Sequence, residues 1–165
     1  KGEKMITTII LFMLSVLLEG IIPNVLRNVT PFFVIAVIVI WGMNFKHQKL
    51  FYYISFIFGI LYDVIYNNTL FLTGFIYVLI AFLCFNINGK NKYFIKAFFT
   101  YLLMCLLYII IMVLFTFSYN QYNFKKVSDI LCDGLIINVI YFLFIYLIYI
   151  VINCIFGHRL KKSSY

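Results

Sequence analysis

The sequence predicts an all-α integral membrane protein with six transmembrane helices. Of its 165 residues, 65% are hydrophobic and only 11% are charged, whereas roughly a quarter of an ordinary soluble domain is charged. The apolar residues form long runs separated by short polar breaks. A helix needs about 20 mostly apolar residues to cross a bilayer, so six crossings with short turns use nearly the whole chain. We therefore expect a single transmembrane domain over residues 1–165.

The apolar runs fix the order of the six spans. The predicted spans cover residues 5–22, 28–43, 50–66, 70–87, 94–117 and 130–156, with polar, Asn-rich or basic breaks between them. The first run follows a basic start, as a signal peptide does, but no small-residue cleavage site comes after it, so we expect a retained helix. Four residues, KGEK, precede Met5, and the sequence leaves open whether they are native.

The basic residues predict the orientation of the chain. Six spans put both termini on one side, and the ends and loops of that side carry ten of the 13 Lys and Arg residues, against three on the other side. Because cytoplasmic loops are enriched in Lys and Arg, we predict cytoplasmic N and C termini. The net charge of +8 thus reflects topology and not binding of nucleic acid. Anionic lipid is the expected neighbour of this basic rim.

This orientation places most acids and many amides at the outer ends of the spans. For Glu19, Asp129 and Asp133, a position among the lipid headgroups explains the pattern as well as a specific role does. Asp63 differs because it stands three residues inside its predicted span. A carboxylate at the bilayer centre costs on the order of 3 kcal/mol, less near the edge, and usually turns toward the helix bundle. We therefore expect Asp63 to face protein.

The surroundings of Asp63 predict a helix contact. One face of its helix is formed at three- and four-residue steps by Tyr52, Phe56, Gly59, Asp63 and Tyr66. Gly59 allows a second backbone to come close, as small residues do in membrane helix pairs, and the next span has Gly74 and Ala81 on one face. The candidate residues for helix contact or partner binding are Gly59, Asp63, Asn67, Asn68 and Gly74.

No arrangement of residues predicts an enzyme. Hydrolysis or group transfer needs a positioned nucleophile and base, or a metal with its ligands. The only histidines, His47 and His158, lie beside basic residues at the cytoplasmic edge, and the four cysteines occupy separate apolar segments without CxxC spacing. We expect no catalytic residue, cofactor or metal site. The middle of the spans carries only amides such as Asn138 and Asn153, so no conduction path is visible.

The segment around Asp63 resembles the family of the rod shape-determining protein MreD. Gly59 and Asp63 match a glycine and an acid four residues apart that are typical of that family, and the AFL sequence at residues 81–83 matches the close of its next span. Residues 27–41 resemble its polar, Pro-containing entry to the second span. The sequence departs from the family at Asn67 and Phe71, where glycine is common, which puts the geometry of the turn in doubt.

The resemblance implies a non-enzymatic scaffold of the bacterial cell-elongation machinery. Such a scaffold is a multi-pass protein of the cytoplasmic membrane. Its implied partners are MreC, which has a large outer domain, and further the actin-like MreB and the RodA glycosyltransferase with its transpeptidase. Such a scaffold supports rod shape and lateral peptidoglycan synthesis. We expect Asp63, with Gly59, to shape a contact used by MreC or by the bundle itself.

Two other interpretations stay open. One is a substrate-binding S component of an energy-coupling-factor vitamin transporter, a small six-span fold that the MreD family resembles. Such components commonly show an AxxxA pair in the first span, and residues 5–22 contain no alanine, which disfavours this alternative. The other is a membrane protein of unassigned role in which the acid only caps a helix contact.

Overall fold

The computed structural model describes residues 2–25, 30–42, 47–67, 71–88, 94–118 and 124–162, with side chains described at 6–25, 30–42, 47–66, 71–87, 94–115 and 134–154. All the regular structure in these ranges is helical. The helices in chain order are α1 (Gly2–Val25), α2 (Phe33–Gly42), α3 (Gln48–Tyr62), the π-helical turn η1 (Asp63–Asn67), α4 (Leu72–Asn88), α5 (Phe94–Ser118) and α6 (Phe124–Lys162). The all-α prediction is confirmed, and each predicted span has a helix.

Four of the helices are long and apolar enough to cross a membrane. Their candidate spans are Ile6–Val25, Gln48–Tyr66, Phe94–Phe115 and Gly134–Cys154, whereas α2 and α4 are shorter apolar helices. Large hydrophobic side chains lie exposed along the outside of α1, α3, α5 and α6. Water would disfavour so much apolar surface, whereas lipid accommodates it. The protein is therefore a membrane protein, and the count of six complete crossings stays a prediction.

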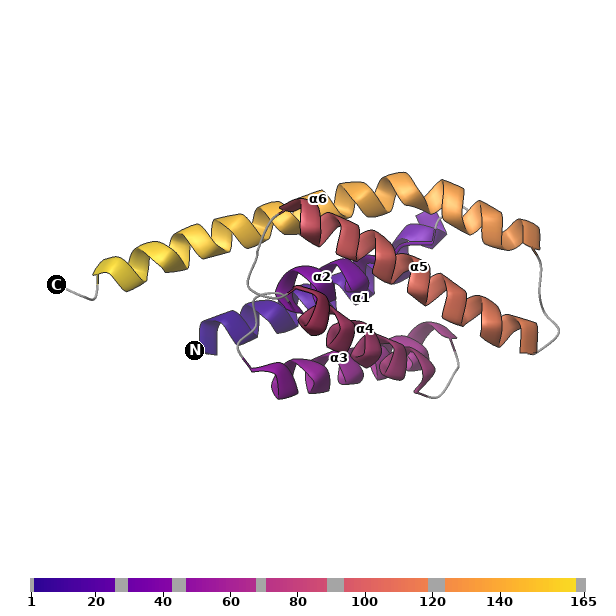
Figure 1. The fold of residues 1–165 in the computed structure, drawn as a ribbon, viewed down its shortest axis with the longest axis horizontal. Coiled ribbons are helices and arrows are strands. Elements are labelled where there is room, and N and C mark those ends of the chain that lie inside the picture. Colours follow the sequence, from indigo (N-terminus) through magenta and orange to yellow (C-terminus); the bar gives the residue numbers. More distant parts are fainter. Residues whose placement is uncertain are drawn as a thin grey trace.

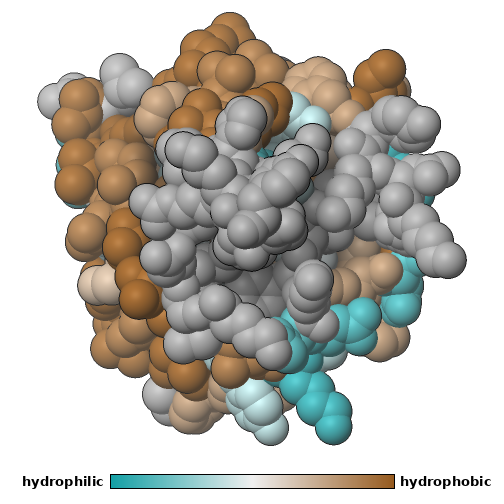
Figure 2. Space-filling model, turned by 90° about the vertical axis from the view of Figure 1, so that its left-hand side faces the viewer, coloured by the Kyte–Doolittle hydropathy of each residue, from teal (hydrophilic) through white to brown (hydrophobic). Residues whose placement is uncertain are grey.

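Neighbouring helices alternate in direction, so the chain passes back and forth along the long axis of the bundle. Figure 1 shows the N-terminal end of α1 and the C-terminal end of α6 at the same side of the molecule. We call this the terminal end, and the opposite side, where α1 and α3 finish and α2 and α4 begin, the turn end. Figure 2 looks onto the terminal end, where apolar side chains cover much of the visible flank and hydrophilic ones gather at one edge.

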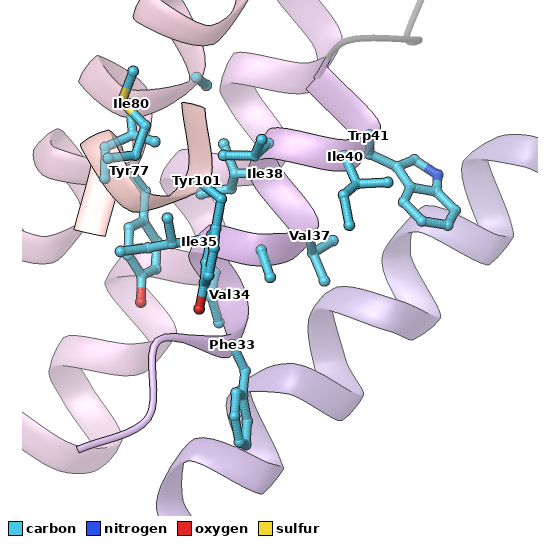
Figure 3. Close-up of a cluster of buried hydrophobic side chains, with 14 of the residues drawn as sticks. Phe33, Val34, Ile35, Val37, Ile38, Ile40, Trp41, Tyr77, Ile80 and Tyr101 are labelled. Atoms are coloured by element: carbon cyan, nitrogen blue, oxygen red, sulfur yellow. The ribbon is translucent and has the colours of Figure 1, made fainter. Parts of the chain in front are cut away.

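Helix α2 is the centre of the core. All ten of its residues are buried, and it packs against α1, α4, α5 and α6. Figure 3 shows side chains leaving it in different directions, with Phe33 and Val34 at one end and Trp41 at the other. A helix that is apolar all round is expected where protein surrounds it. At 1.5 Å per residue, it is only about 15 Å long.

The second helix begins later than the sequence predicts. The sequence predicts residues 28–43, whereas the helix begins at Phe33 and residues 30–32 are not helical. Pro31 lacks a backbone N–H and has a fixed φ, which favours a helix start over a helix interior. Backbone without helical hydrogen bonds is tolerated at membrane depth only where protein covers it and supplies partners. The start of α2 must therefore receive its hydrogen bonds from other helices.

Candidate functional site

Asn138 of α6 supplies the first of these hydrogen bonds. The Phe32 amide donates to Asn138 Oδ1 at 2.6 Å, and Asn138 Nδ2 donates to the Thr30 carbonyl at 3.1 Å. Gly134, one helical turn earlier in α6, allows this approach, because a Cβ there would lie 2.8 Å from the Thr30 carbonyl oxygen. One buried amide side chain therefore satisfies a donor and an acceptor of the non-helical segment.

Glu19 of α1 supplies the next. Its Oε1 accepts a hydrogen bond from the Val34 amide at 2.7 Å, and its carboxylate is also bonded by the side chain of Tyr77 of α4. The side chain is only 4% exposed, so Glu19 faces protein and not the lipid headgroups. A carboxylate at the first turn of a helix is stabilised by the unpaired amides and the positive end of the helix dipole. Glu19 therefore caps α2 from a neighbouring helix.

Asp63 holds the start of α4 in the way that Glu19 holds the start of α2. It is the first residue of η1 and is fully buried, which confirms the prediction that it faces protein. Its Oδ2 accepts a hydrogen bond from the Thr73 amide at 2.8 Å, across the turn that joins η1 to α4. Asp63 therefore caps the start of α4.

The predicted glycine contact lies directly beside Asp63. A Cβ built on Gly59 would lie 2.4 Å from the Cα of Gly74, so the backbones of α3 and α4 touch at these two residues. Phe56 covers the other side of Gly74, and Tyr52 packs on Phe85 further along α4. Four members of the predicted face of α3 therefore turn toward α4. Such close approach is how helices associate in lipid.

Tyr66, the fifth member of that face, turns elsewhere. It lies against Gly20 of α1, where an added Cβ would overlap its ring. The π-helical turn contains one more residue per turn than an α-helix, so the residues after it are rotated about the helix axis. The sequence pattern assumed an unbroken α-helix, which explains the difference.

The backbone of Phe71 adopts a conformation that favours glycine. Its φ of 66° lies in the left-handed region, which glycine adopts freely and other residues adopt at a cost. The resemblance to the MreD family places glycine at this position. Asn67 ends η1, and its side chain, like the whole of Asn68, lies outside the described residues.

The two carboxylates belong to one polar network. The rings of Tyr62, Tyr77 and Tyr108 lie close enough to both Glu19 and Asp63 to interact with their charges. Tyr108 is also hydrogen bonded to the side chain of Thr73, and Tyr101 donates to the Asn138 carbonyl at 3.3 Å. Figure 3 shows the hydroxyls of Tyr77 and Tyr101 directed toward the Val34 end of α2. We call this set the turn-end network: Glu19, Thr30, Tyr62, Asp63, Thr73, Tyr77, Tyr101, Tyr108 and Asn138.

The sequence pattern does not predict most of this network. Asn138 stands out only as an amide in mid-span, and the pattern gives Tyr77 no role. Pro31 is the signal that points to such partners, because a helix that starts just after a proline inside an apolar run needs buried acceptors for its first amides. Among the described residues, no group of three His, Cys, Asp or Glu side chains is arranged to hold a metal ion. The network, as far as it is described, positions helices.

Fold and site together define a small helical membrane protein in which buried acids and amides fix helix starts near one end of the bundle. The chain belongs to the MreD family, because the family model for rod shape-determining protein MreD matches residues 3–156. This confirms the resemblance seen in the sequence and implies a role in the determination of rod shape. Comparisons with curated proteins and with solved structures gave no match.

Proposed function

We propose that this protein is a non-enzymatic scaffold of the cell-elongation machinery in the bacterial cytoplasmic membrane. In this role it crosses the membrane six times with both termini in the cytoplasm. It binds MreC and, on the cytoplasmic side, MreB and the RodA glycosyltransferase with its transpeptidase. It thereby supports rod shape and lateral peptidoglycan synthesis. The observation that carries the proposal is the family match over residues 3–156.

The arrangement of charge supports two-sided contacts. The terminal end carries His47 and Lys49, both exposed, and the sequence adds further basic residues to the loops and tails predicted on that side. A basic rim suits cytoplasmic partners and anionic lipid headgroups. The turn end carries the buried acids and is predicted to face outward, toward the large domain of MreC.

Burial supports a division between residues that hold the bundle together and residues that meet a partner. Asp63, Gly59 and Gly74 are buried between α3 and α4, so they serve the bundle. A partner at the turn end meets the exposed side chains beside them. Val64 and Ile65 of η1 are 62% and 56% exposed, and Phe71 is 45% exposed. We propose these three residues as the surface that MreC contacts.

Capture of MreC from native membranes tests this proposal. The wild-type protein, tagged and expressed at native level, is expected to retain MreC in mild detergent. A Val64→Ala/Ile65→Ala double variant is expected to lose most of it. Tyr53→Ala is the matched control, because Tyr53 is 69% exposed on α3 but lies toward the terminal end. Failure of the wild type to retain MreC, together with normal rod shape in cells lacking the protein, would contradict the proposal.

The same preparation examines the vitamin-transporter alternative, which the family assignment disfavours. A substrate-binding component is stabilised by its vitamin, because a ligand that binds only the folded state shifts the unfolding equilibrium. It also retains an ATPase-coupled scaffold in place of MreC. Neither result is expected here.

A further inference from the structure

The turn-end network forms a continuous path from the Asp63 turn to the start of α2. Asp63 holds the Thr73 amide of α4, and Tyr77, one helical turn further along α4, bonds Glu19. Glu19 in turn holds the Val34 amide of α2. Three of these links are hydrogen bonds between different helices, and the first turn of α4 connects Thr73 to Tyr77. A shift of α4 that breaks the first hydrogen bond therefore also alters the support of the last.

Helix α2 extends this path toward the terminal end. It is short, fully buried and apolar. The described side-chain hydrogen bonds that hold it, from Asn138 and Glu19, lie at its start. Packed elements of this kind shift as units, because close-packed interiors do not deform smoothly. At its far end Trp41 packs on Tyr149 of α6 with ring centroids 5.6 Å apart. Gly42 lies against Phe51 and Cys84, and a Cβ there would be 3.7 Å from the Cys84 Cβ.

We propose that α2 is a coupling element that transmits the state of the Asp63 turn to the terminal end of the bundle. This inference rests on the proposed function, since it gives the scaffold a route by which a contact made outside the membrane alters a contact made inside. A partner that contacts Val64, Ile65 or Phe71 shifts the Asp63 turn. This shift changes the position of the start of α2, and the movement of α2 changes the packing around Gly42.

Cys84 is a natural reporter of that packing. Its side chain is fully buried beside Gly42, whereas Cys154 is exposed. A chain in which Cys105, Cys132 and Cys154 are replaced by Ala leaves Cys84 as the only thiol. The rate at which a small maleimide labels this thiol in nanodiscs then measures how often the end of α2 opens. The experiment uses the purified protein without MreC, so its outcome is independent of the test of the proposed function.

Asp63→Ala is expected to raise the Cys84 labelling rate about tenfold, since it removes a charged acceptor from a buried amide. Leu61→Ala is the matched control, because this side chain, two residues before Asp63, is exposed and its loss leaves the network intact. Tyr77→Phe is the decisive variant. It keeps the ring and removes only the hydroxyl bonded to Glu19, and it is expected to raise labelling several-fold without unfolding the protein.

Phe142→Ala distinguishes transmission through the network from a general loosening of the bundle. Phe142 is fully buried and stacks on Tyr101 at 4.7 Å, but it makes no described hydrogen bond in the network. It is expected to leave Cys84 protected. Equal labelling in Phe142→Ala and Asp63→Ala, or unchanged labelling in both Asp63→Ala and Tyr77→Phe, would overturn the proposal.

Discussion

The helices of the pairs α3–α4 and α5–α6 follow one another in the chain, but the two pairs are held together in different ways. In α3–α4 the backbones touch at Gly59 and Gly74, and a hydrogen bond from Thr73 to Asp63 closes the turn. The backbones of α5 and α6 approach each other at almost no described position. Their contact is made by rings, with Phe142 of α6 between Phe98 and Tyr101 of α5 at centroid distances of 5.6 and 4.7 Å.

This difference shows what determines which apolar helices pack together in lipid. Lipid tails are as apolar as Leu, so burial alone does not favour one pairing. Contact between glycines and a buried hydrogen bond fix both the distance and the register of α3 against α4. Stacked rings fill a wider gap and tolerate more variation. One added methyl group between α3 and α4 should therefore lower the free energy of unfolding strongly. A side chain of different shape between α5 and α6 should lower it only slightly.

Gly59→Ala is expected to have the largest effect. The added Cβ would meet backbone atoms of Thr73 and Gly74 at 2.9 Å or less, and backbone cannot rotate away as a side chain can. We expect a loss of about 3 kcal/mol in the free energy of unfolding, measured by denaturant titration in detergent micelles.

Two other glycines are graded controls for this effect. A Cβ on Gly74 would meet side-chain atoms of Phe56 and Ile60 at 3.3 Å, and one on Gly42 would lie 3.4 Å from the Phe51 ring. Side chains can adjust, so Gly74→Ala should cost less than Gly59→Ala, and Gly42→Ala least of all. Equal costs at all three positions would show that the backbone contact is not what joins α3 to α4.

Asp63→Ala is expected to come next. It leaves the buried Thr73 amide without this acceptor, which costs about 2 kcal/mol. Asp63→Asn keeps an acceptor oxygen at the same position and is the matched control. If both variants unfold at the wild-type denaturant concentration, Asp63 does not stabilise the start of α4.

Phe142→Leu tests the other pair. Leu keeps an apolar side chain between α5 and α6 while removing the stacking surface, so we expect a loss of only about 1 kcal/mol. The same titration measures it. A loss equal to that of Gly59→Ala would remove the contrast between the two pairs.

Phe71→Gly is expected to have the smallest effect, and a favourable one. Glycine relieves the left-handed backbone at this position, but it also adds freedom to the unfolded chain, so we expect a net gain of about 0.5 kcal/mol. Phe71→Ala removes the same ring and keeps the strained backbone, and it should show no gain. Thermal unfolding followed by circular dichroism compares the two.

The sequence predicted much of the fold because hydrophobic runs are local. The predicted span 94–117 nearly coincides with α5 (Phe94–Ser118), and the span 50–66 covers most of α3 and η1. Prediction failed where the partner is distant in the chain. The start of α2 depends on Asn138, 106 residues after Phe32, and no local pattern shows that bond. The π-helical turn was missed because a three- and four-residue repeat assumes uniform α-helix.

The candidate site was predicted in part for the same reason. Gly59, Asp63 and Gly74 were found because they recur at helical spacing or near a turn. Glu19 was noticed, but nothing nearby in the sequence shows that it faces Val34, 15 residues away in the next helix. Tyr77 was hidden among 14 tyrosines, and only its position relative to Glu19 gives it a role.

The bond between Phe32 and Asn138 also has a consequence for biogenesis. Residue 32 emerges from the ribosome long before residue 138, and during that interval α2 lacks one of the groups that complete its start. A buried amide without its acceptor is unfavourable in hydrocarbon, so the early helices cannot reach their final arrangement until α6 has been synthesised and inserted. A chain that stops before α6 would therefore lack this hydrogen bond at the start of α2.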